Sequence, residues 1–441
     1  MANLRNVDSI IYARWIIPVI PHNKMFTDCA LVIDNGNIIA IAPEKEVDER
    51  FSATHTHRLA NHAVMPGLIN AHGHTPMTLL RGYADDLPLQ TWLEEHIWPA
   101  EGQFVDADFV QHGSKLAIAE MIRSGTTCFS DMYFFPEETA SVAHNAGMRC
   151  QITFPVFEFP SNWGSGPDDY ITKGLTLADH YRSHELINIG FGPHAPYTVS
   201  DETFKRIATL APELQCAIHI HVHEIADEVA RAVAEHGTRP LQRLHDLGVL
   251  TPQTQCVHMT QVNDEDIELL QSSGAHIIHC PESNLKLASG FCPVQTLMDA
   301  DINVALGTDG CASNNNLDLF GEMHTAALLA KAVAGNAGAL NAHQALQMAT
   351  INGARALGID DKVGSLEVGK AADITAIALD DIEQAPLYDL PSQLVYTHNG
   401  HRVSHVWVAG KLLMDNRNLL TLNTKDIAKT TYQWQQKLSS N

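Results

Sequence analysis

The sequence predicts an α/β protein: a (β/α)8 barrel of the TIM type with a small composite β-sandwich domain built from both chain ends. Two observations indicate the barrel: strand-like and helix-like stretches alternate through residues 63–364, and eight strand-like stretches occur there. Such alternation implies parallel strands joined by crossover helices, and eight units in about 300 residues suit this barrel. The third observation is that both ends are β-rich, which assigns residues 1–62 and 365–441 to the second domain.

The strands expected in the barrel are short apolar runs bounded by turn residues. They cover residues 63–72, 126–131, 149–154, 187–193, 216–221, 255–258, 276–280 and 303–309. Helical patterns lie between most of them, over residues 109–124, 136–146, 201–210, 226–236, 264–273 and 293–300. Gly125, Gly147, Gly237 and Gly274 follow four of these helices, as C-terminal stop residues do.

The chain ends carry strand patterns that cannot be stable in isolation. Residues 8–13 and 29–33 are β-rich, and Asp34-Asn35-Gly36-Asn37 is a turn signal before a return strand over residues 38–42. Comparable strands cover residues 372–377 and 403–414 near the other end. Because a lone hairpin is marginal in water, we expect the two ends to pair into one small domain. Two separate β units are the alternative.

Charge and cysteine usage narrow the class of protein. Lys and Arg number 28 against 51 Asp and Glu, a formal charge of −23, which repels nucleic acid and anionic membranes. The eight cysteines are scattered without a Cys-x-x-Cys pair and several lie in apolar runs, as buried thiols of a reducing compartment do. No signal peptide or membrane-length apolar run is recognisable, so we expect a cytoplasmic protein. The sequence leaves open whether it is a homo-oligomer.

His72 and His74 end the first predicted strand with one glycine between them. Side chains at i and i+2 of a strand point to the same face, so two imidazoles lie side by side. Such a pair suits a borderline-soft ion such as zinc. The alternative is two unrelated histidines in a chain that contains 25.

Histidines and acids recur at the ends of the predicted strands, where barrel enzymes place their chemistry. They are His72 and His74 (first strand), His194 (fourth), His219, His221, His223 and Glu224 (fifth), His258 (sixth) and Asp309 (eighth). Independent core histidines would not favour the same end of each strand, so this convergence predicts a metal site. Spacing leaves open which histidine of the fifth strand is a ligand. The deepest, His219, is equally suited to packing or to supporting a ligand from behind.

These motifs, in this order, resemble the amidohydrolase superfamily and more narrowly its 5-methylthioadenosine/S-adenosylhomocysteine deaminases, and the resemblance covers nearly the whole chain. The motifs that carry it are Asn70-Ala71-His72-Gly73-His74, Asp85-Asp86-Leu87-Pro88-Leu89, Ile97-Trp98-Pro99-Ala100-Glu101, His194-Ala195-Pro196-Tyr197-Thr198, His221-Val222-His223-Glu224, Val257-His258-Met259-Thr260, Cys280-Pro281-Glu282-Ser283-Asn284 and Gly307-Thr308-Asp309-Gly310.

The resemblance implies one zinc ion per subunit, held by His72, His74, His221 and Asp309. It implies that Glu224 and His258 lie beside the metal-bound water and that Glu101 and His194 contact the substrate, Glu101 at the ribose hydroxyls. No lysine ends the fourth strand, where binuclear relatives carry a carbamylated lysine, and this favours a single ion. Donor chemistry makes zinc the default, with iron(II) and manganese(II) as open alternatives.

Deamination of an adenine ring needs water to attack C6 and ammonia to leave. Zinc lowers the pKa of a water ligand from about 16 to about 7, and Asp309 can accept the released proton. Glu224 is the candidate shuttle to N1 and to the departing amine, with substrate contact implied, and His258 orients the attacking oxygen. The alternatives are a helix-start acid for Glu224, a structural histidine for His258, ordinary packing for His194, and for Glu101 one acid among the 51 in the chain without a role in the site.

The substrate is the least determined point. Family members that accept a homocysteine tail often carry an arginine past the third strand, but Arg149 lies at the start of that strand. Phe154, Phe157 and Phe159 favour an apolar methylthio group, so we hypothesise that methylthioadenosine is preferred over S-adenosylhomocysteine; core packing is the alternative for these rings. Rival functions are another aminopurine or guanine deaminase, a triazine-type hydrolase, a silent zinc scaffold, and a nucleic-acid-editing deaminase, which the charge opposes.

Overall fold

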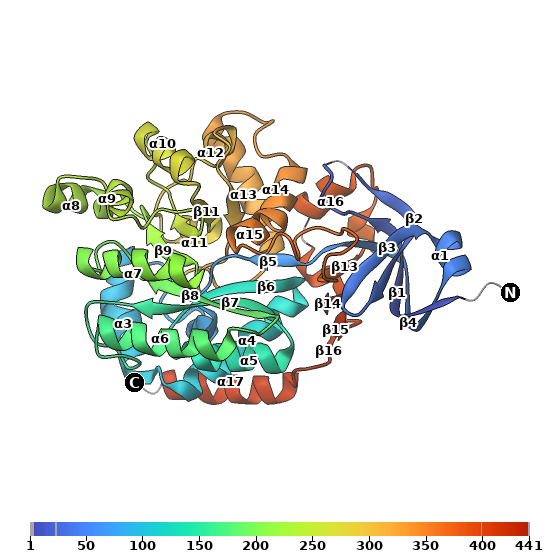
Figure 1. Cartoon of the computed structure of the whole chain (residues 1–441), viewed down its shortest axis with the longest axis horizontal. Helices are drawn as coiled ribbons and strands as arrows, with labels where there is room; N and C mark the ends of the chain where they lie inside the picture. Colours follow the sequence, from blue (N-terminus) through green and yellow to red (C-terminus); the bar gives the residue numbers. More distant parts are fainter. Residues whose placement is uncertain (1–3, 23, 398, 440–441) are drawn as a thin grey trace.

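The computed structural model describes residues 4–22, 24–397 and 399–439, and it consists of a barrel with a separate sheet beside it (Figure 1). The barrel sheet has eight parallel strands in chain order. They are β5 (Leu68–Asn70), β6 (Thr126–Met132), β7 (Arg149–Val156), β8 (Ile187–Pro193), β9 (Ile218–Val222), β10 (Thr254–His258), β11 (His276–His279) and β12 (Val304–Leu306). Backbone bonds close the ring: Ala71 N donates to Leu306 O at 2.9 Å, and Thr308 N to His72 O at 3.1 Å. The predicted (β/α)8 fold is therefore confirmed.

Helices surround the barrel strands and cover their mouth. The surrounding helices are α4 (Ala107–Arg123), α5 (Pro136–Ala146), α6 (Pro167–Tyr181), α7 (Asp201–Leu214), α8 (Ala226–His236), α9 (Pro240–Asp246), α10 (Asp264–Ser273), α11 (Pro281–Lys286), α12 (Val294–Asp299), α13 (Leu319–Ala334), α14 (Ala342–Met348) and α15 (Ile351–Ala356). Short helices over the mouth are η1 (Thr75–Leu80), α2 (Leu89–Thr91), η2 (Trp92–Ile97) and α3 (Trp98–Phe104). No helix in the described part of the chain has the length and apolarity to cross a membrane.

Local signals explain why several helices have the predicted bounds. Helix α10 begins at a capping box in which Asn263 and Asp266 exchange side-chain and backbone hydrogen bonds. Gly147, Gly237 and Gly274 end α5, α8 and α10 with positive φ values of 75°, 73° and 70°. Helix α7 instead continues past residue 210 to Leu214, although Pro212 lies inside its last turn.

The first predicted strand, over residues 63–72, is wrong as a single element because it divides at Gly67. Residues 63–66 end the long strand β4 (Phe51–Pro66) of the separate sheet, and β5 starts the barrel directly after it. A Cβ at position 67 would lie 2.0 Å from Thr127 Oγ1, so only glycine permits this transition. Both halves are buried and apolar, which is why the pattern shows one continuous run.

The two chain ends build one sheet, so the alternative of two separate β units is wrong. Its order is β16-β15-β14-β13-β4-β1-β2-β3, with the ends joined where Ala376 of β13 pairs with Val64 of β4. Its other strands are β1 (Arg5–Ile16), β2 (Phe26–Asp34), β3 (Asn37–Pro43), β13 (Ile374–Ala378), β14 (Val403–Val408), β15 (Lys411–Asp415) and β16 (Asn418–Leu419). The sheet curls on itself, because Ala372 N donates to Gly36 O at 2.8 Å, and it encloses an apolar core that includes Ile11 and Trp407.

Two further differences between the predicted and the observed elements lie in the C-terminal part of the chain. The predicted strand over residues 403–414 is a hairpin, because Ala409 and Gly410 turn it with φ values of 47° and 75°. Helix α17 (Thr424–Ser439) lies along the barrel, where Trp434 Nε1 donates to His112 Nδ1 of α4 at 3.2 Å (Figure 1). The remaining helices are α1 (Glu44–Arg50), η3 (Ile382–Gln384), α16 (Leu390–Tyr396) and η4 (Gly400–Arg402). The division into residues 63–364 and the two ends stays a proposal.

A buried ion pair joins the barrel to the end sheet. Arg149 Nε and a terminal guanidinium nitrogen contact the two carboxylate oxygens of Asp373 at 2.8 and 3.0 Å, and Ala409 N donates to the same carboxylate at 2.8 Å. Breaking a buried pair leaves one uncompensated charge. We therefore expect Arg149→Met to lower the free energy of unfolding by about 3–5 kcal/mol, measured by urea denaturation. The double variant with Asp373→Leu should recover part of the loss, and a single variant as stable as the wild type would contradict this role.

Candidate active site

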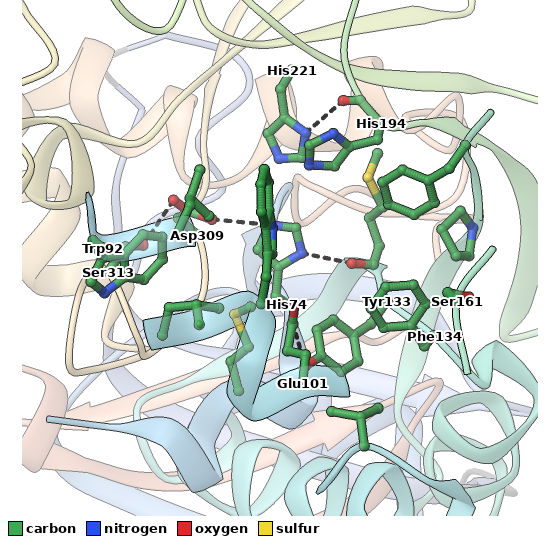
Figure 2. Close-up of a pocket in the computed structure, with 18 of the residues that line it drawn as sticks. His74, Trp92, Glu101, Tyr133, Phe134, Ser161, His194, His221, Asp309 and Ser313 are labelled. Carbon is green, nitrogen blue, oxygen red and sulfur yellow. Dashed lines mark hydrogen bonds and ion pairs between the residues drawn. The ribbon is translucent and has the colours of Figure 1, made fainter. Parts of the chain in front are cut away.

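Side chains from three strand ends meet at the mouth of the barrel. His72 and His74 follow β5, His221 lies on β9 and Asp309 follows β12, and one possible ligand atom from each lies within 4.8 Å of the others. Figure 2 shows the side chains of His74, His221 and Asp309 pointing toward one another. Three imidazoles and one carboxylate at this separation fit a first-row divalent cation such as zinc.

Backbone carbonyls orient two of the histidines. His74 Nδ1 donates to Met132 O at 2.6 Å, and His221 Nδ1 donates to His194 O at 2.8 Å. A proton held on Nδ1 leaves the Nε2 lone pair free for a metal ion. Both Nε2 atoms are therefore available as ligands.

A buried hydrogen-bond chain orients His72 in the same way. Gln255 Nε2 donates to Ala356 O at 2.7 Å, so its Oε1 must be the acceptor for His219 Nδ1 at 2.6 Å. His219 Nε2 is then the acceptor of the 2.7 Å bond from His72 Nδ1, and His72 Nε2 is free. Of the three histidines on the fifth strand, His221 thus offers the ligand atom and His219 supports His72. His223 points elsewhere, with Nε2 accepting from Leu241 N at 3.2 Å.

Asp309 is held as a carboxylate by the groups around it. Its Oδ2 accepts from Ser283 Oγ at 2.7 Å and Ser313 Oγ at 2.9 Å, while Oδ1 lies 3.3 Å from Nε2 of both His72 and His74. Burial alone would raise the pKa of Asp309, but the adjacent imidazoles of His72 and His74 hold it well below its usual range. A low pKa keeps the group charged, as a metal ligand must be.

Glu224 and His258 form a second pair beside these four residues. Glu224 follows β9 with 14% of its side chain exposed, and its Oε2 lies 3.8 Å from His258 Nε2. Burial, and then the nearby Asp309, raises the pKa of Glu224 to about 8. Burial lowers the pKa of His258. Groups whose pKa values are perturbed in this way are suited to proton transfer at neutral pH.

A cavity of about 630 Å³ opens from the metal-ligand group and has mostly apolar walls. Glu101 of α3 lies in its wall, where it is 9% exposed and accepts a hydrogen bond from Tyr133 Oη at 2.6 Å (Figure 2). Burial raises the pKa of Glu101 to about 7. His194 also lines the cavity, with Nδ1 3.2 Å from Thr198 Oγ1. All of the predicted site residues except His72 therefore line one cavity, and His72 is fully buried within the ligand group beside it.

Part of the cavity wall was not predicted from the sequence, and one aromatic ring lies elsewhere than expected. Tyr133, directly after β6, was missed, although its position at a strand end was an available signal. Phe157 and Phe159 line the cavity as expected, but Phe154 does not: it is fully buried and packs against Phe191, with ring centroids 4.8 Å apart. The prediction for Phe154 is wrong because the ring lies within β7, below the mouth.

Comparison with known proteins agrees with this geometry. Residues 63–413 match the amidohydrolase family. A 5-methylthioadenosine/S-adenosylhomocysteine deaminase of Saccharophagus degradans is 59% identical over 440 residues, covering 100% of this chain and 99% of the relative. A 5'-deoxyadenosine deaminase of Methanosarcina mazei is 41% identical, covering 95% and 96%.

A solved structure resembles the chain throughout its length. An adenosine deaminase from Xanthomonas campestris with bound zinc superimposes with a TM-score of 0.98 at 46% identity, covering 100% of both chains. The resemblance inferred from the motifs is confirmed. The chain is an enzyme and belongs to the amidohydrolase family.

Proposed function

We propose that the enzyme catalyses the zinc-dependent hydrolytic deamination of an adenine nucleoside to the inosine analogue and ammonia. The observation that carries the proposal is a single cavity with a three-histidine, one-carboxylate group at one end and a buried carboxylate, Glu101, in its wall. The names of the similar deaminases support an adenine nucleoside as substrate. Membership of the amidohydrolase family does not by itself separate this function from its rivals, which are a guanine or other aminopurine deaminase and a triazine-type hydrolase.

His72, His74, His221 and Asp309 would hold one ion per chain; we propose zinc, and iron(II) or manganese(II) fits the same donors. When bound, the ion lowers the pKa of a water ligand towards neutrality. Asp309 Oδ1 accepts one proton of the attacking water while Glu224 gives its own proton to ring N1. Glu224 then takes the second water proton from the new C6 hydroxyl and passes it to the leaving amine, and the proton on Asp309 returns to Glu224 for the next turnover. His258 orients the attacking oxygen, and His194 contacts the purine. Together these steps replace the C6 amine by oxygen.

Composition and structure support a proposal for the cellular setting. All eight cysteines are free and buried, which suits a reducing compartment, and we propose a cytoplasmic enzyme. The formal charge of −23 opposes binding to nucleic acid or anionic lipid, so the proposed partner is the small-molecule substrate.

The first test is a screen for ammonia release with metal content measured on the same sample. We expect turnover of methylthioadenosine, adenosine and S-adenosylhomocysteine and none of guanine or triazines. Methylthioadenosine should have the highest kcat/KM, because Phe157 and Phe159 are apolar and no Lys or Arg among the described residues lines the main cavity to pair with a carboxylate. We expect a preference over S-adenosylhomocysteine of at least about tenfold. A preference for S-adenosylhomocysteine would overturn the expectation about the tail.

Glu101→Gln tests whether this carboxylate recognises a ribose. Two charge-assisted hydrogen bonds to a diol should be weakened, so we expect kcat/KM for nucleosides to fall about 10- to 100-fold. Turnover of free adenine, which has no ribose, should change little. Glu95→Gln is the matched control, because Glu95 lies in the same segment but is exposed. An equal loss on nucleoside and free base would place Glu101 in a structural role.

A further inference from the structure

The segment Cys280-Pro281-Glu282-Ser283-Asn284, which starts α11, supports two site residues from behind. Ser283 Oγ donates to Asp309 Oδ2 at 2.7 Å, and the neighbouring Asn284 places its Nδ2 3.0 Å from His258 Nδ1. Asn284 is 1% exposed and is not among the residues that line the cavity. Its side chain therefore acts through His258 and not on the substrate.

The orientation of the Asn284 amide decides which nitrogen of His258 carries the proton. In the observed orientation one N–H of Nδ2 donates to His258 Nδ1, and the carbonyl Oδ1 and the second N–H have no hydrogen-bond partner among the described residues. The reversed amide would give Oδ1 a partner but leave both buried N–H donors without an acceptor, and an unpaired N–H is the more costly group to bury than an unpaired carbonyl. Nδ1 of neutral His258 is thus an acceptor, and its proton is on Nε2.

The backbone conformation at the end of β10 also holds the His258 ring in the orientation that the Asn284 hydrogen bond requires. His258 and Met259 both have left-handed backbone conformations, with φ values of 77° and 48°, at the end of β10. Such conformations are uncommon for residues other than glycine and are retained where the surrounding structure determines them. The turn leaves Nε2 3.8 Å from Glu224 Oε2, too far for a direct hydrogen bond. Nε2–H is free to meet an atom of the reactants.

We propose that Asn284 is a positioning residue that keeps the proton of neutral His258 on Nε2, so that His258 donates a hydrogen bond to the oxygen that adds to the substrate and does not act as the base. This inference rests on the proposed function. It leaves the carboxylates Asp309 and Glu224 as the groups that accept and carry the proton of the attacking water. Every proton in the reaction is then accounted for without a change at His258.

Asn284→Asp tests the proposal because a carboxylate can only accept a hydrogen bond. At low pH His258 of the variant becomes an imidazolium paired with the introduced carboxylate, and Nε2 keeps its proton. At high pH the remaining proton stays on Nδ1 beside the carboxylate, and Nε2 becomes a bare acceptor. Burial lowers the pKa of His258, Asp309 and Glu228 raise it, and His74 lowers it. These influences are the same in the wild type and in the variant. We therefore expect kcat of the variant to fall at least tenfold as the pH rises, an alkaline limb that the pH profile of the wild type lacks.

Asn303→Asp is the matched control. Asn303 Nδ2 lies 3.1 Å from His276 Nδ1, and His276 Nε2 donates to Pro252 O at 3.1 Å, which is the same arrangement away from the site. This control should keep the wild-type pH profile. Asn284→Ala, which imposes no tautomer, should lose severalfold in kcat without a new limb. Higher kcat of Asn284→Asp at high pH than at low pH would make His258 a base and overturn the proposal, as would a profile parallel to the wild type.

A measurement on the wild-type holoenzyme covers the case in which the aspartate variant does not fold. The ¹⁵N chemical shifts of histidine-labelled protein, with His258 assigned by comparison with His258→Gln, distinguish a protonated Nε2 from a protonated Nδ1. We expect the proton on Nε2. A proton on Nδ1 would overturn the inference while leaving the deaminase proposal intact. Absence of ammonia release from every nucleoside would instead refute the proposed function without changing the tautomer result.

Discussion

Glu224→Gln is expected to lower kcat by about 10²- to 10⁴-fold, the usual contribution of a positioned proton carrier. Glutamine has nearly the same shape and can still donate a hydrogen bond to N1, but it cannot transfer a proton. Burial and Asp309 raise the pKa of Glu224 to about 8, so this carboxyl group can both bind and release a proton near neutral pH. The substitution should therefore remove the transfer step and leave the cavity unchanged.

The measurement is steady-state deamination, with metal content determined on the same protein. KM should change much less than kcat, and one metal ion per chain should remain, because Glu224 is not among the four candidate ligands. Glu235→Gln is the matched control, since Glu235 also lies on the segment after β9 but has 69% of its side chain exposed. Retention of more than about a tenth of kcat would assign proton transfer to another group.

His74→Ala is expected to reduce the metal content below one ion per chain and activity by at least about 100-fold. Loss even of a residue that only supports a ligand typically costs 10- to 100-fold, and His74 offers a candidate ligand atom itself. Added zinc should not restore the variant. Chelator-treated wild-type enzyme should lose activity to a similar extent and regain it with zinc, because its ligand set is intact.

Metal analysis and assays of both samples check this result. His184→Ala provides the control, because His184 is only half-buried and contacts His144, Leu186 N and the Tyr181 ring, none of which belongs to the candidate ligand group. This variant should keep full metal content and activity. Reconstitution of the chelated enzyme with iron(II) or manganese(II) compares the alternative ions. Full turnover by demetallated protein would refute a metal-dependent mechanism.

Much of the candidate site could be read from local patterns because the barrel imposes a simple rule. His72, His258 and Asp309 each follow a short apolar run, and the ends of parallel strands meet at one mouth. Histidines and acids are uncommon at such buried positions, so their repetition is informative. Tyr133 and Asn284 lie at comparable positions but were not recognised as site residues, since aromatic and amide side chains are equally common in ordinary packing and caps.

Spacing could not choose among His219, His221 and His223, because alternate residues of a strand share one face. The choice depends on contacts from other strands: Gln255 holds His219, and the carbonyl of His194 orients His221. The hydrophobic pattern likewise could not locate the change of sheet at Gly67, since the strands before and after it are both buried.

The sequence by itself determined the alternating elements, the β-rich ends and the residue types at the strand ends. Tertiary structure alone decided which atoms meet: the ligand atoms within 4.8 Å, the tautomers of His72 and His258, and the burial of Glu101. The physical reason is that sequence periodicity encodes the local direction of a side chain, whereas distances between remote residues depend on barrel closure. Desolvation and hydrogen bonding, and with them each pKa, depend on those distances.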